Sequence, residues 1–248
     1  MKFSVCIDAL FAGKDFAESM EAVKNAGMDT FEFWGWWDKD LKKIKKAKEE
    51  LDMNIAAFCT KMISLVDASV RKQNLEGLKE SIHAAREMGC KTLISQVGNE
   101  LAGVSRQEQH KNLVEGLEAC VPLLEEAGIT LVFEPLNTLV DHKGYYLYSS
   151  EEAFQIVDEV NSKNVKVLYD IYHQQIMEGH LISRISGNIG RIGHFHAAGN
   201  PGRHELDTGE INYGNIFDVI RHSGYEGYVG LEYFPLKDAG EGLKNLLK

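Results

Sequence analysis

The stretch Thr130-Leu131-Val132-Phe133-Glu134-Pro135-Leu136-Asn137 is a short apolar run that ends in a carboxylate and an amide. Its β-branched and aromatic residues predict a buried strand. Seven further runs of this kind lie along the 248 residues, at 3–8, 30–36, 54–59, 92–97, 165–173, 192–199 and 228–234. The sequence therefore predicts eight strands.

Amphipathic stretches separate these runs. Asp15, Ser105 and Ser149 each precede a glutamate by three residues, which is the pattern of a capping box at a helix start. We predict helices over 15–26, 41–51, 73–88, 107–126, 151–160 and 216–222. Strands that alternate with helices in a chain of this length predict an α/β fold, a single (β/α)8 TIM barrel over residues 1–248.

The charge balance argues against several classes of partner. The net charge is −10, whereas a protein that binds nucleic acid through its phosphates or an anionic membrane surface needs a basic face. No apolar run approaches the roughly 20 residues that cross a bilayer. The N-terminus lacks the pattern of a secretory signal, and the four cysteines show no CxxC spacing. We expect a cytoplasmic protein with reduced thiols and with neither nucleic acid nor membrane as a partner.

In a TIM barrel the functional groups stand at the C-terminal ends of the strands. Four successive predicted strands carry a potential metal ligand there, namely Glu134, Asp170, His196 and Glu232. A carboxylate inside an apolar run is costly to bury unless something pairs with it, and no cluster of Arg or Lys is near in the sequence. We therefore predict one divalent metal site, and its oxygen-rich ligands favour Mn²⁺ or Mg²⁺, with Co²⁺ tolerated by the imidazole.

This arrangement predicts proton abstraction next to a carbonyl. A metal that chelates the carbonyl and the adjacent hydroxyl of a small sugar would acidify the carbon-bound proton by stabilising an enediolate. Glu134 and Glu232 are then the candidate general base and acid, one on each face of the substrate.

Further side chains are candidates for substrate binding. His173 stands three residues after Asp170, and Asn137 is the last residue of the stretch 130–137. Arg203 lies in the irregular segment 200–213, where it either binds substrate or pairs with a nearby acidic residue at the surface. His194 alternates with His196, so that both point to the same side of the sheet, where His194 contacts substrate or serves as a hydrogen-bond partner.

A tryptophan cluster follows the second predicted strand. Trp34, Trp36 and Trp37 either line the pocket or form a subunit contact in a homo-oligomer, and we favour the pocket, with Trp36 as a substrate contact. Glu32 on the same strand is either a further pocket group or the partner of a lysine on a neighbouring strand.

Several motifs resemble the hydroxypyruvate isomerase family of the sugar isomerase/epimerase superfamily, whose members are metal-dependent TIM barrels. They are Glu134-Pro135-Leu136-Asn137, Leu168–Gln174, Pro201–Glu205 leading into Gly209–Tyr213, and Gly230–Tyr233. The resemblance implies metal ligation by Glu134, Asp170, residue 196 and Glu232, with the two glutamates as acid and base, and substrate contacts from His173 and Arg203.

One position departs from that pattern. Hydroxypyruvate isomerases typically carry Gln where this chain has His196, whereas ketose 3-epimerases that act on tagatose or psicose resemble it in having His. We predict an isomerase of a small hydroxy-oxo acid or sugar, with a ketose 3-epimerase as the alternative. A lyase of the inosose dehydratase type, an apurinic endonuclease and a non-catalytic binding barrel are less favoured.

Overall fold

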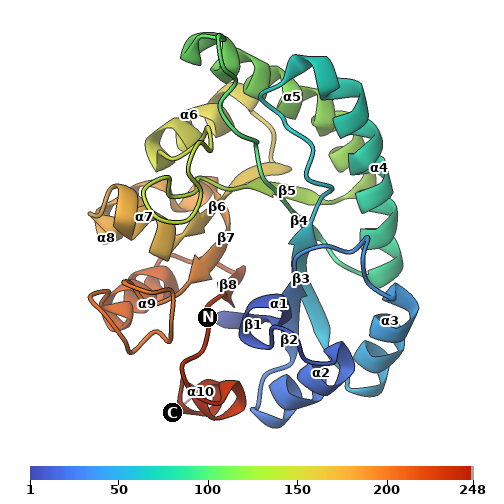
Figure 1. Ribbon diagram of the computed structural model, residues 1–248, viewed down its shortest axis with the longest axis vertical. Helices are drawn as coiled ribbons and strands as arrows, with labels where there is room; N and C mark the ends of the chain where they lie inside the picture. Colours follow the sequence, from blue (N-terminus) through green and yellow to red (C-terminus); the bar gives the residue numbers. More distant parts are fainter. Residues whose placement is uncertain (247–248) are drawn as a thin grey trace.

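Eight parallel strands close into a barrel inside a ring of helices in this computed structural model, which describes residues 1–246 (Figure 1). The strands follow one another around the barrel in chain order: β1 Lys2–Cys6, β2 Thr30–Phe33, β3 Asn54–Cys59, β4 Thr92–Ser95, β5 Thr130–Phe133, β6 Val165–Asp170, β7 Ile192–Ala197 and β8 Tyr228–Leu231. The predicted fold class is confirmed. The last two residues of the predicted range 1–248 lie outside the described residues.

The helices lie on the outside of the barrel (Figure 1). Asp15, Ser105 and Ser149 accept backbone N–H groups at the starts of α2, α5 and α6, as their spacing predicts. The helices are α1 Ile7–Leu10, α2 Phe16–Asn25, α3 Leu41–Glu50, α4 Arg71–Met88, α5 Arg106–Ala127, α6 Ser150–Val160, α7 Ile171–Met177, α8 Leu181–Asn188, α9 Tyr213–His222 and α10 Ala239–Leu246.

Several strands end earlier than their apolar runs predict. The run 165–173 is a strand only up to Asp170, because one carboxylate oxygen of Asp170 accepts the backbone N–H groups of Tyr172 and His173 and so caps α7. The prediction of strand for the last three residues of that run is wrong. Helices α1, α7, α8 and α10 were missed because each has at most eight residues, which is too short for a helical period to stand out from the sequence.

The interior of the barrel has an apolar part and a polar part. Ala57, Cys59, Ile94, Val132 and Leu168 form a separate apolar cluster contributed by β3 to β6. The corresponding positions on β7, β8, β1 and β2 carry polar side chains or glycine: Ser4, Glu32, His194, His196 and Gly230. The four cysteines are buried and form no disulfide. Among the described residues, no helix is long and apolar enough to span a bilayer.

The apolar cluster generates a prediction about stability. Leu168 is fully buried, so that Leu168→Ala leaves a cavity next to β5 and β7 and should lower the free energy of unfolding by about 2–5 kcal/mol in urea denaturation. Ile182→Ala on α8 is the matched control, because the Ile182 side chain is exposed and its loss should change the free energy by less than about 0.5 kcal/mol. Equal losses from the two variants would contradict this assignment of the core.

Candidate active site

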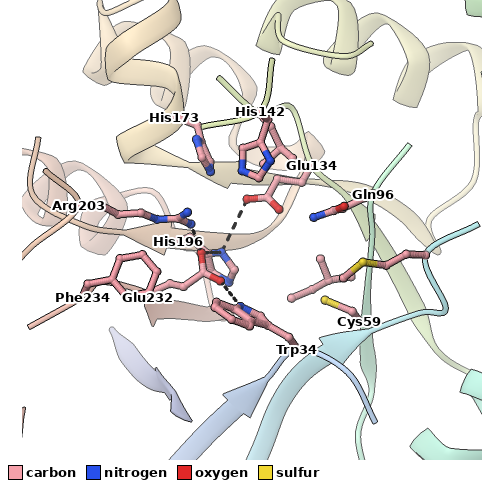
Figure 2. A pocket seen from close by; sticks show the side chains of 13 residues that line it. Trp34, Cys59, Gln96, Glu134, His142, His173, His196, Arg203, Glu232 and Phe234 are labelled. Carbon is pink, nitrogen blue, oxygen red and sulfur yellow. Dashed lines mark hydrogen bonds and ion pairs between the residues drawn. The ribbon is translucent and has the colours of Figure 1, made fainter. Parts of the chain in front are cut away.

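A cavity of about 240 Å³ opens at the C-terminal ends of the strands (Figure 2). Five of the predicted site residues line it or close its floor, and they come from five different places in the chain. Glu134 follows β5, His196 lies in β7 and Glu232 follows β8, while His173 comes from α7 and Arg203 from the loop after β7. The barrel therefore brings together residues that are far apart in the sequence.

The predicted metal ligands converge and are all buried. Ligand atoms of Asp170, His196 and Glu232 lie within 4.8 Å of one another. His196 Nδ1 is 3.3 Å from Glu232 Oε2 and 3.8 Å from Glu134 Oε1. Glu134 Oε1, Asp170 Oδ2 and His196 Nδ1 are buried and make no hydrogen bond to the described residues. Buried polar atoms without partners are rare, so this donor set fits a divalent cation that would satisfy them.

Beneath the cluster, Glu32 lies between two histidines. Glu32 Oε2 is hydrogen-bonded to His194 Nε2 and to Ser4 Oγ, each at 2.9 Å. Glu32 Oε1 lies 2.9 Å from His196 Nε2, and these two atoms form an ion pair whose angles do not meet hydrogen-bond geometry. Burial opposes ionisation of Glu32, but the charges of His196 and His194 hold its pKa at about 2. An ionised carboxylate at that distance requires a proton on His196 Nε2. Nδ1 is therefore the nitrogen that can offer a lone pair to a metal.

The glutamates flanking His196 differ in their electrostatic surroundings. Burial raises the pKa of Glu134 to about 7, and the charges of Asp170 and Glu232 act in the same direction, against the opposing effect of His196. Burial would also raise the pKa of Glu232, but the charges of His196 and Arg203 hold it well below its ordinary value. Arg203 forms an ion pair with Glu232 Oε2. Glu232 is therefore the carboxylate held ionised by its neighbours.

The loop after β7 carries Arg203 into the cavity rather than to the surface. Its guanidinium pairs with Glu232, lies 3.6 Å from Asp170 Oδ2 and packs over the rings of Tyr172 and Phe234. Arg203 has a φ of 56°, a left-handed conformation that is uncommon for a residue with a side chain and that tends to occur at functional sites. The surface ion pair considered from the sequence is not what the structure contains.

Only one of the three tryptophans lines the cavity. Trp34 Nε1 donates to Glu232 Oε1 at 2.6 Å, and its backbone N–H donates to Asp8 at 2.7 Å. Trp36, the member predicted to contact substrate, instead donates to Ser81 Oγ on α4 and lies outside the cavity. The difference arises because β2 ends at Phe33, so that the chain has already turned away from the barrel at Trp36.

The remaining candidates lie behind the residues that line the cavity. His194 points into the barrel interior with His196, but it contacts Glu32 and not the cavity. Asn137 is fully buried behind His173 and contacts its ring. The burial of His173 lowers its pKa well below the ordinary value, so that this ring is neutral.

Sequence reasoning missed several residues that line the cavity. Cys59 ends the third predicted strand and Gln96 lies near the end of the fourth, so that the rule that found Glu134 could also have found them. His142 and Phe234 also line it, from the loops after β5 and β8. These two loops carry no periodic pattern that would have pointed to a site.

Comparison with known proteins agrees with this geometry. The family model described as "Xylose isomerase-like TIM barrel" matches residues 20–248. The chain belongs to this family. It is 33% identical over 253 residues to the hydroxypyruvate isomerase of Escherichia coli (strain K12), which covers 98% of this chain and 97% of that protein. The resemblance to hydroxypyruvate isomerases inferred from the motifs is confirmed.

Solved structures show the same barrel. A family 2 AP endonuclease from Brucella melitensis superposes with a TM-score of 0.90 at 29% identity, covering 98% of this chain and 96% of the other. A 3-keto-D-glucoside 4-epimerase from E. coli superposes with a TM-score of 0.84 at 21% identity, covering 99% and 98%, which shows a shared fold. The curated relatives of this xylose isomerase-like protein are named isomerases, and the chain is an enzyme of the isomerase and epimerase class.

The packing beneath the metal-ligand cluster leads to a prediction at Gly230. A Cβ at this position would lie 2.3 Å from Glu32 Oε1 and 2.7 Å from His196 Cδ2. Gly230→Ala should therefore separate Glu32 from His196 and lower the free energy of unfolding by about 1–3 kcal/mol, measured in urea.

The control is Gly187→Ala on α8, because a Cβ there meets no atom within 4 Å. This variant should be as stable as the parent or slightly more stable, since alanine favours a helix over glycine. If Gly230→Ala were equally well tolerated, the close contact between β8 and the Glu32–His196 pair would not be a real constraint.

Proposed function

We propose that this protein is a divalent-metal-dependent isomerase that moves a proton within a small hydroxy-oxo acid or sugar, as its hydroxypyruvate isomerase relatives are named to do. The observation that carries the proposal is the convergence of Glu134, Asp170, His196 and Glu232 at the mouth of the barrel, with ligand atoms left unpaired. The cavity is of a size that suits a substrate of a few carbon atoms.

The four side chains would hold the ion through carboxylate oxygens and His196 Nδ1. Asp170 suits this role because its Oδ1 is occupied by the start of α7, which leaves Oδ2 facing the cluster. When bound, Mn²⁺, Mg²⁺ or Co²⁺ would polarise the substrate carbonyl and stabilise negative charge on its oxygen.

The proton transfer is assigned to the two glutamates. Both oxygens of Glu232 accept hydrogen bonds, from Trp34 and from Arg203, whereas Glu134 Oε1 has no such partner. We assign Glu134 as the base that takes the proton from the hydroxyl-bearing carbon. The C–H electron pair forms the carbon–carbon double bond of an enediolate, and the carbonyl electrons move to oxygen.

Two outcomes follow from that intermediate. If the proton returns to the former carbonyl carbon while the hydroxyl proton moves from one oxygen to the other, the carbonyl has shifted by one carbon and the reaction is an isomerisation. An epimerisation requires that Glu232, which its neighbours hold ionised, first takes up a proton from solvent and delivers it to the original carbon from the opposite face, while Glu134 releases its proton to solvent. The second outcome remains the alternative proposal because His196 resembles the ketose 3-epimerases at this position.

Nucleic-acid chemistry is less well supported. Arg203 is the one lysine or arginine among the residues that line the cavity, and it is already paired with Glu232 and Asp170. With a net charge of −10, the chain offers little to hold a phosphate backbone. A small uncharged or singly charged substrate suits this cavity better.

The metal site generates a prediction that can be checked without activity. Glu32→Gln removes the carboxylate that orients His196 through Nε2, and loss of such a supporting group typically costs about 10–100-fold in metal affinity. Isothermal titration of chelator-treated protein with Mn²⁺ should show this loss. Ser4→Ala, which removes another partner of Glu32 but leaves the contact with His196, should bind Mn²⁺ nearly as the parent does. Unchanged affinity in Glu32→Gln would contradict the proposed role.

The activity is tested with a substrate panel on Mn²⁺-loaded enzyme in deuterated water. We expect conversion of hydroxypyruvate or 2-oxo-tetronate, with deuterium incorporated at carbon, and a fall in kcat of about 10²–10⁴-fold in Glu134→Gln, because a neutral amide cannot accept the proton. The variant must remain folded by circular dichroism.

The products discriminate among the alternatives. Turnover of five- and six-carbon ketoses alone would replace the isomerase proposal with a 3-epimerase, and an unsaturated or deoxy product would indicate a dehydratase. Full activity in Glu134→Gln would show that Glu134 is not the base that takes the proton.

A further inference from the structure

We propose that Asn137 is a positioning residue that fixes His173 in the neutral tautomer with its proton on Nε2, so that His173 presents a hydrogen-bond donor to a substrate oxygen. The role toward substrate rests on the proposed function. The tautomer itself is a consequence of the fold and can be measured whether or not that function is correct.

The orientation of the Asn137 amide is fixed by the backbone after β5. Asn137 Oδ1 accepts the backbone N–H groups of Val140 and Asp141, each at 3.0 Å. An NH₂ group cannot accept these two bonds, so the oxygen must face this loop. The amide nitrogen Nδ2 therefore faces the opposite direction, toward Asp141 Oδ2 and the ring of His173.

The amide nitrogen then determines which ring nitrogen of His173 is protonated. Nδ2 carries two hydrogens, and it lies 2.7 Å from Asp141 Oδ2 and 2.7 Å from His173 Nδ1. The backbone N–H of Asn137 points at the same Nδ1 from 3.4 Å. Two donors facing Nδ1 leave no room for a proton on it, so Nδ1 must be the acceptor. The proton of the neutral ring is then on Nε2.

This geometry is rigid because both side chains are fully buried. Asn137 lies just after β5, whereas His173 lies in α7 directly after β6, so that the contact links two neighbouring strand ends. The tautomer is therefore set before any substrate arrives.

The protonated nitrogen is the one available to a ligand. His173 lines the cavity beside Glu134 and Arg203 (Figure 2). Its Nε2 has no hydrogen-bond partner among the described residues, although Asp170 Oδ2 is 3.5 Å away. A neutral N–H aimed into the cavity can stabilise an oxygen on which negative charge develops, and it cannot act as the base.

The decisive measurement is the protonation of each ring nitrogen of His173. Mg²⁺-loaded enzyme labelled with [¹⁵N]histidine gives long-range ¹H–¹⁵N correlations in which protonated and unprotonated ring nitrogens have distinct shifts, and His173 is identified by its loss in His173→Gln. We expect a protonated Nε2 and an unprotonated Nδ1. A proton on Nδ1 in the parent protein would overturn the proposal.

Two variants test whether Asn137 is the cause. Asn137→Asp keeps an oxygen for the loop but faces His173 Nδ1 with an acceptor, so that the proton should move onto Nδ1. If the transition state uses the N–H, kcat and kcat/KM should fall together by at least about 100-fold. Asn137→Ala removes the side-chain donor and keeps the backbone N–H that faces Nδ1, so that the fraction of the tautomer with its proton on Nε2 should fall without reversing; this supplies a second test should the aspartate variant fold poorly.

The matched control is Asp141→Asn. It neutralises the other partner of the Asn137 amide but keeps an oxygen in place, so that the spectrum of His173 and the turnover should stay close to those of the parent. An unchanged tautomer in both Asn137 variants would refute the positioning role. If the spectra respond as expected while no substrate is converted by the parent enzyme, the proposed function fails and the tautomer assignment stands.

Discussion

The burial of negative charge at the mouth of the barrel is the constraint on which the rest of the site depends. Glu32, Glu134, Asp170 and Glu232 are each at most 6% exposed, and such charges are costly to remove from water unless they are compensated. Burial would lower the pKa of His196, but the charges of Glu232 and Glu32 raise it well above its ordinary value. Without a metal, a proton on His196 Nδ1 and the charge of Arg203 therefore compensate part of the excess, and a divalent cation bound at Nδ1 would take the place of that proton.

This constraint explains why the barrel interior is divided. The apolar cluster from β3 to β6 can fill space by packing alone, but the carboxylates on β2 and after β8 need hydrogen-bond partners beneath them. Ser4 and His194 supply those partners to Glu32, and Gly230 leaves the space in which Glu32 and His196 meet. The polar part of the core is thus the support of the site rather than a defect in packing.

Much of this could be predicted from the sequence, because strand ends in a barrel meet at one rim. The repeated run ending in Glu, Asp or His locates the four candidate ligands without any coordinates. What the sequence could not predict is the path of the chain after each strand. It placed all three tryptophans at the pocket, with Trp36 as the substrate contact, whereas Trp34 is the one that lines the cavity, since the end of β2 is set by tertiary packing and not by the tryptophan run. It also missed His142, whose loop has no periodicity.

A common arrangement links the groups at the rim. Asp170 caps α7 with one oxygen, His196 pairs with Glu32 through Nε2, and His173 accepts from Asn137 at Nδ1. In each case the second polar atom of the side chain faces the cavity, and the first contact determines whether that atom carries a proton or a lone pair. Glu232 is held at both oxygens, by Trp34 and Arg203. Asp170 Oδ2 is also unpaired, but Glu134 is the one carboxylate at the rim whose side chain makes no hydrogen bond to the described residues through either oxygen. A proton carrier has to change its protonation during the reaction, whereas groups that bind or orient must not, and this difference in support is the physical reason to assign the moving proton to Glu134.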